Sequence, residues 1–136
     1  MPTPSKPRGR IVVADDEPSI REVLKSYFAA QYAAYEVHAV SSGEEAVAAV
    51  RAGSPDLVLL DVEMPGMGGV KALRAIRALD PSIPVLMVTG NESSRVAGEL
   101  IALGAASYIP KPVRFDYLDH IVASVLSRHQ GPRPGR

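Results

Sequence analysis

Leu57-Val58-Leu59-Leu60-Asp61 is the stretch that decides the fold of this chain. Its four consecutive apolar residues follow the turn-forming residues 53–55 (GSP), and they predict a short strand buried on both faces, as in a parallel sheet. Residues 64–66 (MPG) then favour a loop and end the strand. Asp61 is therefore expected where a buried strand meets a loop, at the sheet edge where ligands bind.

Four further strands are predicted on the two sides of this stretch. Short apolar or alternating runs occupy residues 11–14, 35–40, 84–88 and 106–110. Each strand is followed by apolar residues at helical spacing, in segments 18–28, 42–50, 70–76, 96–103 and 118–126. Strands that alternate with helices predict an α/β fold, in which a parallel sheet carries helices on both faces.

Polar side chains end four of these five predicted strands. They are Asp15, Asp16, Asp61, Thr89 and Lys111. Because the carboxyl ends of parallel strands face one edge of the sheet, we expect these side chains to lie together. Taken singly, the acidic pair could be a helix cap, Thr89 a capping residue and Lys111 a surface lysine. Their joint occurrence, each at the end of a predicted strand, favours a functional site.

Such a cluster indicates metal-assisted phosphoryl chemistry. Two like charges about 4 Å apart repel by about 4 kcal/mol at an effective dielectric near 20, so the carboxylates must hold protons or a cation. Mg²⁺ suits a site with few carboxylates. Asp61 would be the nucleophile, and the metal, the Lys111 ammonium and the Thr89 hydroxyl would compensate the phosphoryl oxygens. No base stands out for activating water, so the phosphorylated state should persist, which suits signalling.

Composition excludes several other classes of protein. The chain has 136 residues, 15 basic and 15 acidic, so its zero formal net charge gives no sign of nucleic-acid or membrane binding. It lacks cysteine, a secretory signal and any apolar run near the roughly 20 residues of a membrane helix, and we expect a cytoplasmic protein. Its histidines, His38, His120 and His129, share no zinc-ligand spacing.

Four motifs carry a resemblance to a known family. They are residues 13–18 (VADDEP), 59–67 (LLDVEMPGM), 88–90 (VTG) and 108–112 (YIPKP). Over residues 10–128 the sequence resembles the receiver domain of two-component response regulators, the chemotaxis-regulator-like family. The resemblance implies a flavodoxin-like, doubly wound, five-stranded parallel sheet with strand order 2-1-3-4-5 and five helices.

The resemblance also implies a role for each clustered residue. Asp61 would accept a phosphoryl group from a sensor histidine kinase or a phosphotransfer protein, and Thr89 and Lys111 would bind the phosphoryl oxygens. The implied cofactor is Mg²⁺. Its implied ligands are Asp15, Asp16, Asp61 and the backbone carbonyl of Glu63.

Further roles concern switching and regulation. The sequence pattern alone predicts that Tyr108 is a half-buried packing residue. The resemblance implies that it is a switch residue, whose ring turns inward as Thr89 moves. The surface of the fourth helix, fifth strand and fifth helix would then control binding of a downstream protein and a weak phosphorylation-dependent homodimer. Glu63 and Asn91 would tune dephosphorylation, and the peptide between Lys111 and Pro112 would be cis.

The expected domain covers residues 10–129, with disordered tails at 1–9 and 130–136. No output domain follows the fifth helix, which indicates a stand-alone receiver or a fragment of a longer regulator. Two alternatives remain open: a small phosphatase with an aspartyl-phosphate intermediate, and a degenerate receiver used only for docking. A nucleotide-binding Rossmann protein is excluded, because the first strand leads into Asp15 and Asp16 rather than a glycine-rich loop.

Overall fold

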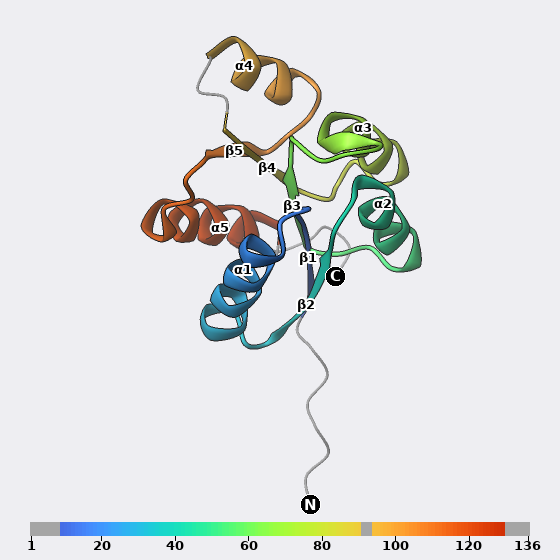
Figure 1. Ribbon diagram of the computed structural model, residues 1–136. Helices are drawn as coiled ribbons and strands as arrows, with labels where there is room; N and C mark the ends of the chain where they lie inside the picture. Colours follow the sequence, from blue (N-terminus) through green and yellow to red (C-terminus); the bar gives the residue numbers. More distant parts are fainter. Residues whose placement is uncertain (1–8, 91–93, 130–136) are drawn as a thin grey trace, which may run out of the picture.

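A computed structural model describes residues 9–90 and 94–129 of the chain. Within these ranges, strands and helices alternate strictly along the sequence (Figure 1). The strands are β1 (Gly9–Ala14), β2 (Tyr35–Val40), β3 (Leu57–Asp61), β4 (Val85–Thr89) and β5 (Ser107–Pro110). The helices are α1 (Pro18–Gln31), α2 (Gly43–Ala52), α3 (Gly68–Leu79), α4 (Ser94–Ala102) and α5 (Phe115–His129).

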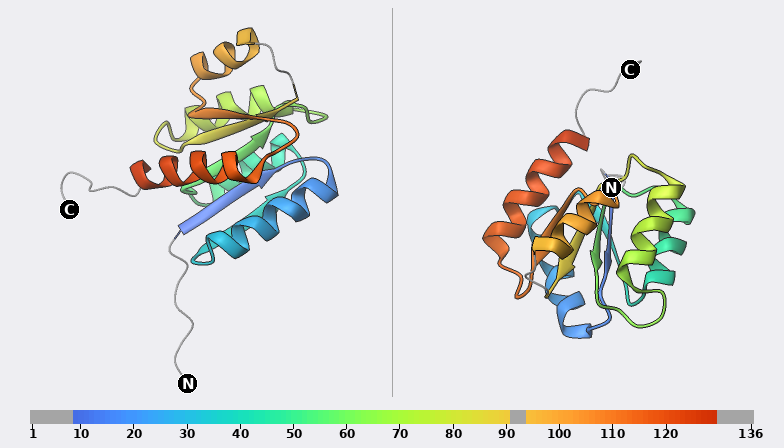
Figure 2. Two further views of the ribbon diagram at one scale, coloured as in Figure 1. Left: turned by 90° about the vertical axis from the view of Figure 1, so that its left-hand side faces the viewer. Right: turned by 90° about the horizontal axis from the view of Figure 1, so that it is seen from above.

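All strand pairings are parallel, and the strands lie in the order β2-β1-β3-β4-β5. This confirms the predicted doubly wound fold and its strand order. The helices cover both faces of the sheet, with α1 and α5 on one side and α2 and α3 on the other (Figures 1 and 2). Parallel strands need such crossover connections, since a short hairpin cannot join them.

Alternation along the strands divides the core between the two faces. In β3, Leu57 and Leu59 belong to the cluster that α1 and α5 cover, whereas Val58 and Leu60 belong to the cluster under α2 and α3. All five residues of β3 are buried, as the unbroken apolar run predicted. The last of them is Asp61, so the central strand carries a carboxylate from the core directly to the sheet edge.

The boundaries differ from the predicted ones by small amounts. β1 begins at Gly9, two residues before the predicted strand, and α1 continues to Gln31. The tails expected to be disordered lie largely outside the described residues. No helix in the described ranges has the length and apolar character needed to cross a membrane.

Gly69 gives a test of the packing beneath the site. A β-carbon at this position of α3 would lie 2.2 Å from the carbonyl oxygen of Asp61 and 2.6 Å from the α-carbon of Val62. Both contacts are with backbone, so Gly69→Ala must displace the end of β3, and we expect a loss of about 3 kcal/mol in the free energy of unfolding by denaturant titration.

Gly98→Ala is the matched control for this prediction. Gly98 is also helical, in α4, but a β-carbon there meets nothing within 4 Å. The control is expected to stabilise the fold by up to about 1 kcal/mol through helix propensity. Equal unfolding midpoints for the two variants would contradict the close approach of α3 to the end of β3.

Candidate functional site

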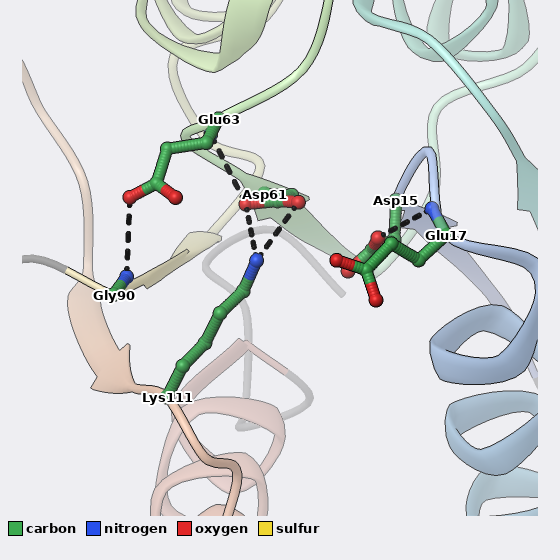
Figure 3. A network of polar contacts seen from close by, with 6 residues as sticks. All are labelled: Asp15, Glu17, Asp61, Glu63, Gly90 and Lys111. Carbon is green, nitrogen blue, oxygen red and sulfur yellow. Dashed lines mark hydrogen bonds and ion pairs between the residues drawn. The ribbon is translucent and has the colours of Figure 1, made fainter.

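Asp61 is the centre of a polar site at the carboxyl edge of the sheet (Figure 3). Its side chain is only 1% exposed. The backbone N–H of Glu63 donates to Asp61 Oδ1 at 3.0 Å, and the Lys111 ammonium lies 3.1 Å from each carboxylate oxygen. Burial of a carboxylate is tolerated here because both oxygens have charged or backbone donors.

Lys111 reaches this carboxylate from the residue directly after β5. Its backbone N–H donates to the carbonyl oxygen of Thr89 at 2.8 Å, which fixes the end of β5 against the end of β4. The peptide between Lys111 and Pro112 is cis, as the resemblance implied. Desolvation lowers the pKa of Lys111, but the hydrogen bond and negative charge of Asp61 outweigh it and raise that pKa above its usual value.

Two further carboxylates, Asp15 and Asp16, lie directly after β1. Asp15 is 1% exposed, whereas Asp16 is exposed to solvent. Asp15 Oδ1 accepts the backbone N–H of Glu17 at 2.9 Å, but its buried Oδ2 has no hydrogen-bond partner in the structure. Desolvation raises the pKa of Asp15 from 3.8 to about 6, and the negative charge of Asp61 adds to this effect.

The three aspartates form a cluster suited to a hard cation. Asp15, Asp16 and Asp61 each offer a carboxylate oxygen within 4.8 Å of the others. Lys111 supplies one positive charge against these three carboxylates, and Asp15 Oδ2 is left without a donor. A buried acceptor without a donor is costly in a protein interior, and a divalent metal ion would satisfy it. The residues present therefore fit a magnesium-type site.

The other predicted residues take different places. Thr89 is buried at the end of β4, one residue beyond Val88, which pairs with Asp61. Tyr108 is half-buried in β5, opposite Met87, and packs against the core cluster on the α2 and α3 face. Asn91 lies outside the described residues. The strand-end residues therefore lie at one edge of the sheet, and Tyr108 lies within β5 near that edge.

Three contacts around the site were not predicted from the sequence. The Arg21 guanidinium donates to the carbonyl oxygen of Asp15 at 2.7 Å, and Glu44 accepts the backbone N–H of Met67 at 3.3 Å. The Glu63 carboxylate accepts the backbone N–H of Gly90 at 3.3 Å. For Arg21 a signal was available, because it lies in the first turns of the helix that follows the acidic pair. The two glutamate contacts depend on loop conformation.

Comparison with known proteins agrees with this geometry. The family described as the response regulator receiver domain matches residues 11–123. The chain is 36% identical over 117 residues to the regulatory protein AtoC of Escherichia coli strain K12, a match that covers 86% of the chain and 25% of that protein. It is 38% identical over 122 residues to the transcriptional regulatory protein ZraR of Salmonella typhimurium, covering 88% and 27%.

A solved structure shows the same relationship. The CheY-like response regulator receiver domain protein from Methanospirillum hungatei superimposes with a TM-score of 0.81 at 28% identity, over 89% of this chain and 95% of that one. The chain spans about a quarter of the length of the two curated relatives. Since the family match covers most of its 136 residues, the chain belongs to the response regulator receiver domain family of two-component signalling.

Proposed function

We propose that this domain accepts a phosphoryl group on Asp61 from a sensor histidine kinase or a phosphotransfer protein, with Mg²⁺ as cofactor. The main support is the arrangement of charges at the strand end. The Lys111 ammonium contacts both oxygens of the buried Asp61 carboxylate, and the neighbouring buried Oδ2 of Asp15 has no hydrogen-bond partner among the described residues. The proposed metal ligands are Asp15, Asp16, Asp61 and the backbone carbonyl of Glu63.

The proposed reaction needs no base to activate the acceptor. An ionised oxygen of Asp61 attacks phosphorus, a P–O bond forms, and the P–N bond of the donor phosphohistidine breaks with its electron pair left on the imidazole nitrogen. The Lys111 ammonium and the Thr89 hydroxyl would then bind phosphoryl oxygens. Bound Mg²⁺ would neutralise the negative charge that the transferred group brings to the three aspartates.

The proposed role is signalling rather than turnover, with self-phosphorylation and slow autodephosphorylation only. Thr89 and Tyr108 are the proposed switch residues, and Glu63 and Asn91 the residues that tune dephosphorylation. The hydrogen bond from the backbone N–H of Lys111 to the carbonyl oxygen of Thr89 supports this role. It joins β5 to β4 at the sheet edge where Asp61 lies, so a change at the site would be passed to β5. Phosphorylation would change the surface of α4, β5 and α5.

Exposed apolar side chains on these elements support a docking role for this surface. Ile101 of α4 is 47% exposed, and Tyr117 of α5 is 40% exposed. Such side chains would contact a downstream protein and, more weakly, a second copy of the phosphorylated domain. We propose residues 10–129 as the extent of this cytoplasmic domain, which would bind neither nucleic acid nor membrane directly.

Incubation of the purified protein with phosphoramidate tests the proposal. With Mg²⁺ we expect intact-protein mass spectrometry to show the gain of one phosphoryl group, and without the metal, in excess chelator, we expect none. A gain that is indifferent to chelator would contradict the metal site. Rapid multiple turnover of an aryl phosphate ester would instead favour the phosphatase alternative, and failure to bind Mg²⁺ would favour the degenerate receiver.

A further inference from the structure

Glu63 connects the acceptor strand to the opposite wall of the site. Its backbone N–H donates to Asp61 Oδ1 at 3.0 Å, while its carboxylate Oε1 accepts the backbone N–H of Gly90 at 3.3 Å (Figure 3). Gly90 directly follows Thr89 at the end of β4. The Glu63 side chain is exposed, so this contact is made by hydrogen bonding at the rim of the site rather than by core packing.

The strand register places the Gly90 amide at the same edge of the sheet as the Asp61 carboxylate. Asp61 pairs with Val88, and both chains continue past the same edge of the sheet because the strands are parallel. Gly90 is two residues beyond Val88, a rise of about 6.6 Å along a strand. Glu63 contacts Asp61 Oδ1 through its backbone N–H and the Gly90 N–H through its side chain, so a phosphoryl group on Asp61 would enter the space beside this amide.

The Glu63 carboxylate and a phosphoryl oxygen would compete for the hydrogen bond of the Gly90 amide. A phosphoryl group brings about two negative charges and several strong acceptor oxygens, and it is stabilised by N–H donors aimed at them. A backbone N–H carries one hydrogen, so it cannot make a full hydrogen bond to Glu63 and to a phosphoryl oxygen at once. The Glu63 carboxylate, near that amide, would also repel the incoming dianion.

We propose that the Glu63 carboxylate holds the Gly90 amide in the unphosphorylated protein and must release it to a phosphoryl oxygen, so that Glu63 weakens the affinity of the site for a phosphoryl group. This inference rests on the proposed function, and it adds a direction and a physical cause to the tuning role of Glu63. Glu63 is therefore a positioning residue: it acts through the donor it occupies and through its charge.

Beryllofluoride, a non-covalent analogue of the phosphoryl group, provides the test. The wild-type protein, Glu63→Gln and Glu63→Ala are titrated with it in the presence of Mg²⁺, and binding is followed by amide NMR. Because exposed charge interactions are small, we expect Glu63→Gln to bind beryllofluoride about threefold more tightly than the wild type. Glu63→Ala, which removes the acceptor completely, should show at least this gain. Added salt should reduce the difference in beryllofluoride affinity between Glu63→Gln and the wild type.

Glu44→Gln is the matched control. Glu44 is also exposed and also accepts a loop amide, that of Met67 at 3.3 Å, but it lies on α2 and does not contact Gly90 in the described residues. Its affinity for beryllofluoride is expected to equal that of the wild type. In the metal-free proteins the Gly90 amide resonance should move in both Glu63 variants and stay in place in Glu44→Gln.

The outcomes separate this inference from the proposed function. If the wild type binds beryllofluoride and the Glu63 variants bind it with equal or lower affinity, Glu63 does not compete for the Gly90 amide. The proposal that Asp61 is the phosphoacceptor is unaffected by that result. If the wild type binds no beryllofluoride with Mg²⁺ present, the proposed function fails, and this inference fails with it. An unmoved Gly90 resonance in both Glu63 variants would overturn the resting contact itself.

Discussion

Replacing Asp61 by asparagine is expected to abolish the phosphoryl-dependent gain in mass and to preserve the fold. The amide has nearly the shape of the carboxylate but no anionic oxygen, so it cannot attack phosphorus. Its carbonyl oxygen can still accept a hydrogen bond from Lys111, which lies 3.1 Å from both oxygens of Asp61. Intact-protein mass spectrometry after incubation with phosphoramidate and Mg²⁺ measures the effect.

Asp56→Asn is the control at the other end of the same strand. Asp56 directly precedes β3, and its Oδ2 accepts the backbone N–H of Arg10 at 2.9 Å, remote from Lys111 along the strand. This variant is expected to gain the phosphoryl group as the wild type does. A full gain in mass for Asp61→Asn would contradict the assignment of the acceptor.

Replacing Asp15 by asparagine is expected to stabilise the metal-free protein near pH 7 and to weaken Mg²⁺ binding. The buried carboxylate has an oxygen without a partner, and desolvation raises the pKa of Asp15 to about 6. Above that pH the group is charged in the folded and unfolded states alike, and the fold carries the cost of burying it. The amide removes that cost, but it also removes an anionic ligand, so Mg²⁺ affinity should fall by roughly tenfold or more.

The pH dependence follows from the direction of this shift. The folded protein holds the Asp15 proton more tightly than the unfolded chain, whose pKa is near the ordinary 3.8. The contribution of this group to stability is therefore present below pH 3.8 and is lost as the pH rises toward about 6. The loss is on the order of 3 kcal/mol, from the difference between the folded and unfolded pKa values. Other groups titrate in the same range, so the difference between wild type and Asp15→Asn isolates it.

Asp16→Asn separates the effect of the acidic pair on Mg²⁺ affinity from its effect on stability. Asp16 neighbours Asp15 but is exposed, so its charge carries little desolvation cost. This variant should lose Mg²⁺ affinity and keep the wild-type pH dependence of thermal stability in the absence of metal. A stability difference between wild type and Asp15→Asn that does not change between pH 4 and pH 7 would contradict the buried, unpartnered carboxylate.

The sheet and the cluster at its edge were predictable because both follow from chain topology. Unbroken apolar runs mark buried parallel strands, and the residue after each run must lie at the common edge. Asp15, Asp61 and Lys111 come from distant parts of the sequence, were predicted to lie together, and are close to one another in the structure. Loop conformation does not enter this prediction, because strand direction alone determines where a strand end lies.

Loop contacts were not predictable in this way. The turn between α1 and β2 closes through backbone hydrogen bonds from the Tyr32 N–H to the Phe28 carbonyl oxygen and from the Tyr35 N–H to the Tyr32 carbonyl oxygen, with the rings of these residues in contact. The contact of Glu63 with Gly90 likewise depends on the rotamer of a long side chain across two loops. Hydrophobic periodicity carries no information about either arrangement.

Identification of the modified residue in the wild-type protein is the direct test of Asp61 as the phosphoryl acceptor. After incubation with phosphoramidate and Mg²⁺, the acyl phosphate is trapped by borohydride reduction and the peptides are sequenced by tandem mass spectrometry. We expect a single modified position, Asp61, with no modification when the metal is chelated. A phosphoryl group on a histidine or on another aspartate, with Asp61 unmodified, would contradict it.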